Sequence, residues 1–147
     1  MPEKPTFVSR VNRAVRALFA VGALLHLLLV GAQPFLAGWS LDGDGDALEL
    51  HGVNGSVILT VSMVLIPLSL LRWRPGRGTA WAPVLTVLLF AAETFQLGMG
   101  YADIHIVHVP LGVGVVIGSF ALVGLAFRRR PEPAAASQTA QRRKVSP

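Results

Sequence analysis

The sequence contains no cysteine, and charged residues are scarce. Of 147 residues, 14% are Asp, Glu, Lys or Arg, whereas 52% are hydrophobic, and the mean hydropathy is positive. The absence of cysteine excludes disulfides, thiolate metal sites and cysteine nucleophiles. The scarcity of charge excludes an ordinary soluble domain of this length, because such domains carry about 25% charged residues. The sequence therefore predicts a membrane protein.

Several long stretches lack charge almost completely. No Asp, Glu, Lys or Arg occurs in residues 17–41, 50–71 and 104–127, and residues 78–102 contain only Glu93. Each stretch is close to the roughly 20 residues that cross a bilayer as a helix. We expect an all-α, four-helix transmembrane bundle with helices at about 14–38, 52–71, 80–100 and 104–127. The connections are short, which predicts an up-down-up-down arrangement.

Positive charge is missing from two of the three predicted loops. The cations precede the first predicted helix, separate the second from the third, or follow the fourth, whereas the other two loops carry only acidic residues. Since Lys and Arg stay on the cytoplasmic side, both termini are predicted to be cytoplasmic in a multi-pass protein of the cell membrane. These scattered juxtamembrane cations indicate contact with anionic lipid and no nucleic-acid partner.

The chain divides into three predicted parts. Residues 1–13 form a cytoplasmic segment, 14–127 the transmembrane domain, and 128–147 a basic cytoplasmic tail. The tail combines proline, alanine and polar residues without apolar periodicity, which predicts disorder. We expect the first helix to be retained, because its charge-free core exceeds the about 7–15 residues of a signal-peptide core and includes His26 and Gln33.

A histidine followed four residues later by glycine occurs twice, in HGVNG (His51–Gly55) and HVPLG (His108–Gly112). Each copy opens a predicted helix and follows a glycine-ended helix carrying polar side chains, within GAQPFLAG or AAETFQLGMG. The two hairpins therefore read as an internal repeat related by a pseudo-twofold axis along the membrane normal. This relationship places His51 and His108 at similar depth near the outer surface, on opposite sides of that axis.

Two facing imidazoles at one depth are suited to the two axial positions of haem b. Gly55 and Gly112 lie one turn deeper on the same helical faces, where the lack of a side chain would leave room for the macrocycle. His105 is offset by about 60° from His108 and is an alternative ligand or a partner for a propionate. The competing interpretation is that these histidines are solvated or hydrogen-bonded interfacial residues.

These features resemble one four-helix half of the haem A synthase family. The residues that carry the resemblance are Gln33, Gly38, Glu49, His51, Gln96, Gly98, Gly100 and His108, within roughly residues 20–125. In that family, histidines at the outer ends of the second and fourth helices of a half flank a haem. The resemblance implies the fold and the haem site rather than the synthase activity. Only one half is present, the outer loop has no cysteine pair, Gly52 follows His51 where the family often has arginine, and Glu49 stands two rather than three residues before His51.

Two ionisable residues fall in the middle of predicted helices, His26 in the first and Glu93 in the third. A charge at the bilayer centre costs about 2.5–3.5 kcal/mol on insertion scales, so we expect the two to pair inside the bundle. Such a pair is either a proton relay or a hydrogen-bonded bridge between helices.

The acidic stretch LDGDGDALEL partly matches a calcium-binding loop. Asp42, Asp44 and Asp46 occupy the first, third and fifth positions of an EF-hand loop, but Ala47 and Val53 occupy the sixth and twelfth. The stretch therefore reads as a flexible acidic loop, which with Glu49 and His51 offers a weak site for a divalent cation.

Taken together, the sequence predicts a haem b-binding membrane protein. It would pass electrons from a membrane donor such as a quinol to an acceptor near the outer face, or modify haem. One alternative is a cofactor-free membrane interaction protein whose basic tail docks a partner. The other is a small proton-coupled transporter that uses Glu93 and His26.

Overall fold

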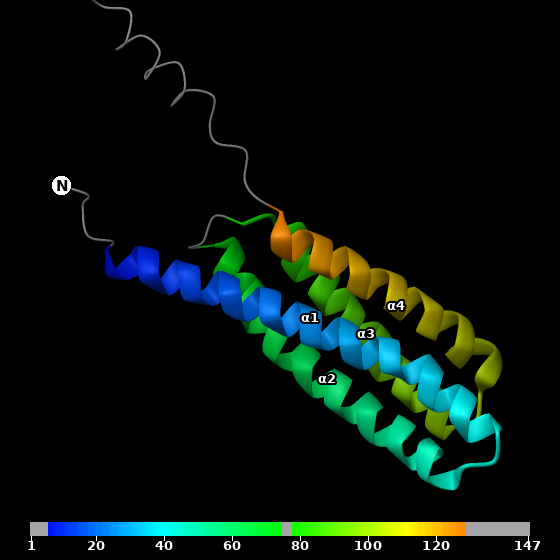
Figure 1. Cartoon of the computed structure of the whole chain (residues 1–147). Coiled ribbons are helices and arrows are strands. Elements are labelled where there is room, and N and C mark those ends of the chain that lie inside the picture. Colours follow the sequence, from blue (N-terminus) through cyan, green and yellow to red (C-terminus); the bar gives the residue numbers. More distant parts are fainter. Residues whose placement is uncertain (1–5, 75–77, 129–147) are drawn as a thin grey trace, which may run out of the picture.

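Four α-helices account for almost all of residues 6–74 and 78–128, the two ranges that the computed structural model describes (Figure 1). The helices are α1 (Phe7–Leu41), α2 (Gly45–Trp73), α3 (Trp81–Tyr101) and α4 (His105–Phe127). Neither range contains a β-strand. The predicted all-α, four-helix architecture is confirmed.

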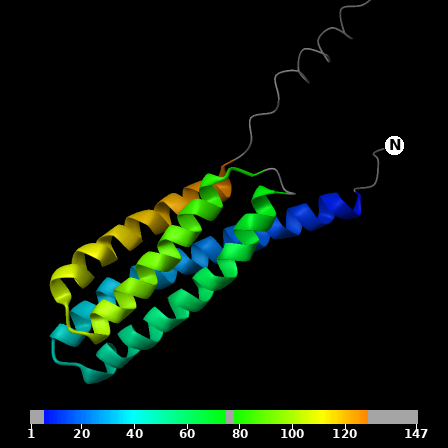
Figure 2. The same ribbon diagram turned by 180° about the vertical axis from the view of Figure 1, so that it is seen from behind.

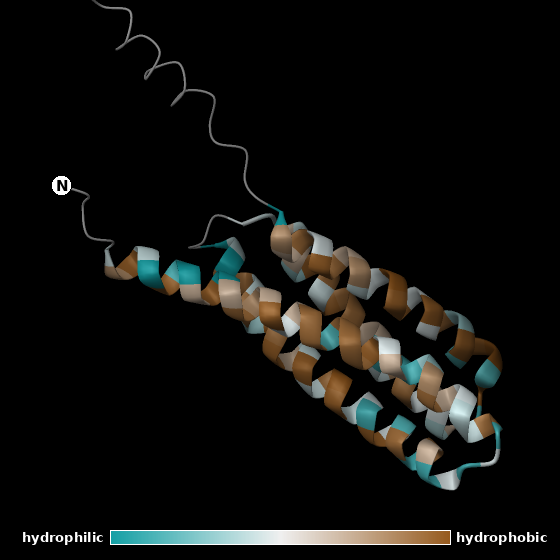
Figure 3. Ribbon diagram, viewed as in Figure 1, coloured by the Kyte–Doolittle hydropathy of each residue, from teal (hydrophilic) through white to brown (hydrophobic). Residues whose placement is uncertain are grey.

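All four helices are long and apolar enough to cross a membrane. The shortest, α3, has 21 residues. A helix of about 21 residues spans about 31 Å, close to the thickness of the hydrocarbon core. Large apolar side chains point outward, among them Leu28 at 71% and Phe120 at 63% exposure. Hydrophobic residues dominate the middle of the bundle, whereas hydrophilic residues gather towards its ends (Figure 3). Such a surface is matched by lipid rather than water, so the chain is a multi-pass integral membrane protein.

At one end of the bundle, a tight turn joins the two helices of each hairpin. Residues 42–44 link α1 to α2, and residues 102–104 link α3 to α4. Gly43 has φ of +96°, a left-handed conformation that glycine adopts without steric cost. The side chain of Asp44 accepts a hydrogen bond from the backbone N of Ala47 at 3.1 Å and thereby caps α2. In this structure the acidic stretch forms a turn and a helix cap.

The helices form a closed ring in which each contacts two neighbours (Figures 1 and 2). The contacting pairs are α1 with α2, α2 with α3, α3 with α4, and α4 with α1. Helices α1 and α3 therefore face each other across the bundle axis, as do α2 and α4. This arrangement is the up-down-up-down bundle that the short loops predict.

The buried positions repeat between the two hairpins. Those of α1 recur in α3 63 residues later, in the pairs Phe19 and Ala82, Ala23 and Thr86, His26 and Leu89, and Val30 and Glu93. Three of the six buried positions of α2 recur in α4 57 residues later, in the pairs Ile58 and Val115, Ser62 and Ser119, and Leu65 and Leu122. The two hairpins are thus structural repeats with equivalent inward faces.

Helices α1 and α2 begin earlier than the hydropathy predicts, whereas α3 and α4 begin within one residue of their predicted starts. Helix α1 starts at Phe7 instead of residue 14, and α2 starts at Gly45 instead of residue 52. The side chain of Thr6 caps α1 by accepting a hydrogen bond from the backbone N of Ser9 at 3.3 Å. Hydropathy marks the part of a helix suited to lipid, whereas the backbone hydrogen bonds continue until a cap ends them. The predicted cytoplasmic segment 1–13 is therefore helical from Phe7 onward. The predicted disordered tail lies outside the described residues, apart from Arg128.

Candidate cofactor site

The rings of His51 and His108 lie side by side between α2 and α4, which face each other across the bundle. Their centroids are 6.0 Å apart and their planes are inclined by 54°. Both side chains are partly buried. The two residues also obey the 57-residue offset that relates the buried positions of these helices. The structure therefore brings together the two histidines of the HxxxG repeat.

A backbone carbonyl from the preceding helix holds each imidazole. Nδ1 of His51 lies 3.2 Å from the carbonyl oxygen of Gln33, and Nδ1 of His108 lies 3.0 Å from that of Gln96. A carbonyl oxygen only accepts, so each Nδ1 carries the proton and donates. Each Nε2 is then left with a lone pair, which is the tautomer that binds a metal ion through Nε2.

The two glutamines are themselves equivalent in the repeat, because they are related by the 63-residue offset of α1 and α3. The amide oxygens of both side chains, Oε1 of Gln33 and Oε1 of Gln96, are buried without a hydrogen-bond partner. Buried polar atoms in native proteins are almost always satisfied by protein, water or ligand. The protein atoms therefore leave a pair of polar groups unsatisfied beside the two histidines.

Gly55 and Gly112 receive these glutamine side chains. A Cβ atom at Gly55 would lie 3.2 Å from Nε2 of Gln33, and one at Gly112 would lie 2.8 Å from Nε2 of Gln96. The sequence-based interpretation placed a macrocycle beside these two glycines. In this structure the side-chain amides of the glutamines occupy that space instead. The glycines thus admit the polar groups that accompany the histidines.

Gly100 gives His108 its position. A Cβ atom at Gly100 would lie 3.0 Å from Cε1 and 3.1 Å from Nδ1 of the His108 ring. The equivalent position in the first hairpin is Ala37, another small residue. The absence of a side chain at Gly100 lets the His108 imidazole pack close to the backbone of α3.

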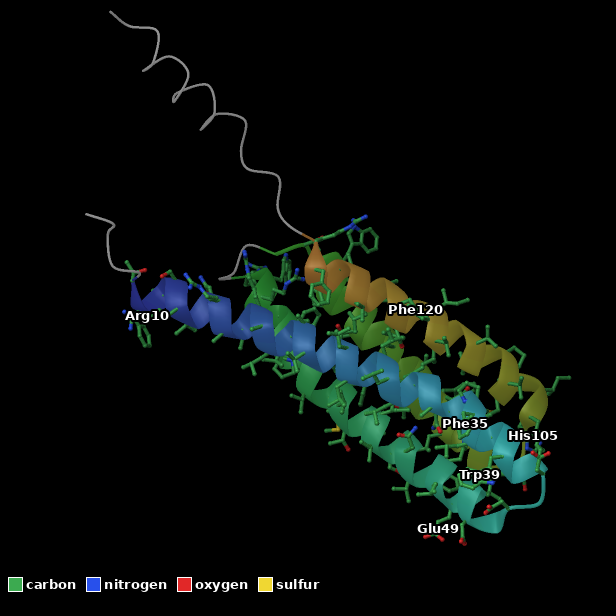
Figure 4. The ribbon with its side chains drawn as sticks, in the orientation of Figure 1. Arg10, Phe35, Trp39, Glu49, His105 and Phe120 are labelled. Carbon is green, nitrogen blue, oxygen red and sulfur yellow. The ribbon has the colours of Figure 1, made fainter. Side chains whose placement is uncertain are left out.

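The remaining candidates at this end of the bundle lie apart from the histidine pair. His105 is the first residue of α4 and is exposed, as is Glu49 on α2. Figure 4 shows both, with Trp39, at the end of the bundle opposite Arg10. Within the described residues, no group of three or more His, Cys, Asp or Glu side chains is placed to hold a metal ion. His108, rather than His105, lies beside His51.

His26 and Glu93 meet in the centre of the bundle. Nε2 of His26 lies 2.7 Å from Oε1 of Glu93, and the residues are 0% and 6% exposed. Because α1 and α3 are not neighbours in the ring, this contact crosses the bundle axis. The structure therefore pairs the two ionisable residues that hydropathy places in the middle of the first and third helices.

The sequence-based prediction did not identify the structural role of one residue. Arg72, assigned there only to membrane topology, is 6% exposed. Its Nη2 donates to the carbonyl oxygens of Leu125 and Ala126 at 2.8 and 3.2 Å, and its guanidinium lies over the ring of Phe19 at 5.2 Å. Arg72 therefore satisfies carbonyls in the last turn of α4 from the other side of the bundle.

The roles of Gln33 and Gln96 were also missed, because the helix ends beside the two turns are longer in the first hairpin than in the second, although the turns themselves are equal in length. Gln33 precedes His51 by 18 residues, and Gln96 precedes His108 by 12. Aligning the helices separately, rather than the hairpins as single segments, would have revealed the equivalence.

No protein-family model, no curated protein and no solved structure matches the chain. The fold and the site geometry define a four-helix integral membrane protein with a paired-histidine centre.

Proposed function

We propose that the protein binds haem b through His51 and His108, and carries electrons between a membrane donor such as a quinol and an acceptor near the end of the bundle that holds the histidines. The separation of the two rings carries the proposal. Two imidazoles on opposite sides of one metal ion, each with a metal–nitrogen distance of about 2 Å, place their ring centroids roughly 6 Å apart. The observed separation is 6.0 Å.

The type and number of ligands also support haem. A haem iron takes four nitrogens from the porphyrin, so the protein supplies only the two axial ligands, and neutral imidazole is a common choice. The carbonyls of Gln33 and Gln96 fix both imidazoles in the tautomer that leaves Nε2 free to bind. The unsatisfied amide oxygens beside them are consistent with a site that is completed by a bound group or by water.

Within this proposal, the bound haem supplies one-electron redox chemistry. His51 and His108 would hold the iron, and the backbone carbonyls that accept from each Nδ1–H would keep the rings oriented. A relationship to the haem A synthase family would agree with this use of the fold, but the proposal does not depend on it.

The orientation in the membrane is part of the proposal. The six described arginines all lie towards one end of the bundle, opposite the acidic turn: Arg10, Arg13, Arg16, Arg72, Arg74 and Arg128. By the positive-inside rule that end is cytoplasmic, and the histidine centre faces the outer side of the cell membrane.

An optical spectrum tests the proposal. The detergent-purified protein, from cells able to supply haem, is measured oxidised and dithionite-reduced beside His51→Ala, His108→Ala and His105→Ala. We expect a sharp low-spin b-type spectrum in the wild type and in the His105 variant, and its loss in the other two. A colourless wild-type protein, or a spectrum that survives both His51→Ala and His108→Ala, would overturn the proposal. Reduction by a quinol analogue in place of dithionite tests the donor.

The buried contact between His26 and Glu93 favours a second candidate, a proton-coupled transporter. Paired ionisable groups inside transmembrane segments are typical of proton pathways. This candidate predicts a colourless protein whose transport activity in vesicles is abolished by Glu93→Gln. The spectrum therefore separates the two candidates.

A further inference from the structure

The contact between His26 and Glu93 departs from the repeat that organises the rest of the bundle interior. The position equivalent to His26 in the second hairpin is Leu89, and the position equivalent to Glu93 in the first is Val30. Both equivalents are buried and apolar. The histidine centre, by contrast, is built from matching residues of both hairpins. Packing at these positions therefore needs no polar group. The polar pair is a feature that the two hairpins do not share.

The pair has free positions for protons. One proton between Nε2 of His26 and Oε1 of Glu93 satisfies their 2.7 Å contact. Nδ1 of His26 and Oε2 of Glu93 are buried, and neither has a hydrogen-bond partner. A second proton can bind at either atom, so the pair can exist in two charge states. In an interior of low dielectric constant, the charge of nearby groups decides which state is favoured.

The pair lies close to the histidine centre along the helices. Glu93 precedes Gln96, whose carbonyl accepts from His108, by three residues, which corresponds to about 4.5 Å of helix rise. His26 precedes Gln33 by seven residues, or about 10.5 Å. Unit charges about 10 Å apart at an effective dielectric constant of about 20 interact by roughly two to three times thermal energy. A change of charge at the centre would therefore be felt at the pair.

No other charged or titratable group lies between the pair and the centre. On α2 the nearest such residues are His51 and Arg72, with none between them in the chain, and on α4 they are His108 and Arg128. On α1 the nearest charged residue that precedes His26 is Arg16. Apart from Glu93, α3 contains no Asp, Glu, Lys, Arg or His. The pair of His26 and Glu93 is thus the titratable site inside the bundle that lies nearest to the histidine centre along the helices, so a change of charge at the centre acts on it first.

We propose that His26 and Glu93 form a redox-linked proton site, which takes up one proton when one electron reaches the group held by His51 and His108. The inference rests on the proposed haem function. A one-electron donor such as a quinol supplies the electron, and the aqueous phase supplies the proton, so the total charge inside the bundle is unchanged. On oxidation, the electron passes to the acceptor and the proton returns to water.

The test is a redox titration of the purified haem protein at a series of pH values. Proton uptake on reduction makes the midpoint potential fall as pH rises, and we expect this slope in the wild type. Glu93→Gln keeps an amide oxygen that accepts from His26 but removes the titratable carboxyl, so we expect the same spectrum with little or no slope. Thr86→Val is the matched control, since Thr86 is a buried polar residue of α3 that only bonds the carbonyl of Ala82. It should keep the wild-type slope.

A second measurement needs no variant. Glu93 is the sole carboxyl residue of α3, so a reduced-minus-oxidised infrared spectrum of the wild type should show a change in a buried carboxyl band. A potential that is independent of pH, a slope that persists in Glu93→Gln, or the absence of any carboxyl band would overturn the inference while the haem stays in place. A colourless protein would overturn the proposed function and this inference together.

Discussion

The imidazole rings of His51 and His108 lie 6.0 Å apart, although they belong to different helical hairpins. Each ring donates from Nδ1 to the carbonyl of an equivalent glutamine, and each histidine is followed at the fourth position by a glycine that admits the amide of that glutamine. The two halves of the site are therefore built alike. This likeness distinguishes a constructed centre from two unrelated interfacial histidines, and it guides the predictions that follow.

Gly100→Ala should disturb the centre without changing a ligand. The new Cβ would lie 3.0 Å from the ring of His108, so the imidazole has to shift. Overpacking of this kind costs about 1–3 kcal/mol. We expect haem affinity to fall by roughly tenfold, the equivalent of 1.4 kcal/mol, measured by haem titration of the haem-free protein.

Gly98→Ala is the control for this substitution, since nothing lies within 4 Å of its added Cβ on the same helix. It should bind haem as the wild type does. Equal affinity in the two variants would contradict the packing of His108 against Gly100.

Arg72→Met should destabilise the bundle at the end away from the histidines. The substitution removes the hydrogen bonds to the carbonyls of Leu125 and Ala126 and leaves both without their partner. Hydrogen bonds from a charged donor contribute about 1.5–3 kcal/mol. We expect a loss of about that size in unfolding by denaturing detergent. Arg74→Met, at an exposed arginine stacked on Trp73, should have little effect, and a loss as large as that of Arg72→Met would count against the buried role.

His26 and Glu93 should prove coupled in a double-mutant cycle. Removing one member leaves the other as a buried polar group without its partner, at a cost of about 3–5 kcal/mol for a buried ion pair. Replacing both with leucine leaves an apolar interior, as the equivalent positions Leu89 and Val30 already do. We expect His26→Leu with Glu93→Leu to be more stable than either single variant, as measured by unfolding. Additive losses would show that the two side chains do not interact.

The absence of cysteine makes the topology simple to measure. Asp42→Cys lies in the turn between α1 and α2, whereas Ala80→Cys lies just before α3 at the opposite end, and both positions are exposed. In intact cells we expect a membrane-impermeant maleimide to label Asp42→Cys, and to label Ala80→Cys only after permeabilisation. The reverse pattern would place both termini outside.

The glycines illustrate how far a sequence pattern reaches. The HxxxG repeat correctly indicated that two equivalent helices carry a histidine and a glycine at one level. It did not reveal that Gly55 admits Gln33 and Gly112 admits Gln96, because both glutamines belong to other helices. The unequal helix ends beside the two turns also hid the constant offsets that relate the glutamines. The charged residues show the same limit, since Arg72 looks like its neighbours in sequence but is buried against α4.

The sequence alone determined the membrane class, the number of helices, their alternating direction and the repeat of the hairpins. These features follow from the preference of each residue for lipid or water and from the short connections. Both are local properties of the chain, which do not depend on which helices pack together. Only the tertiary structure decided that His51 meets His108 rather than His105, that glutamine carbonyls orient both rings, and that His26 reaches Glu93 across the axis. Those choices depend on how each helix is rotated and how side chains interdigitate, and this is settled by packing all four helices together.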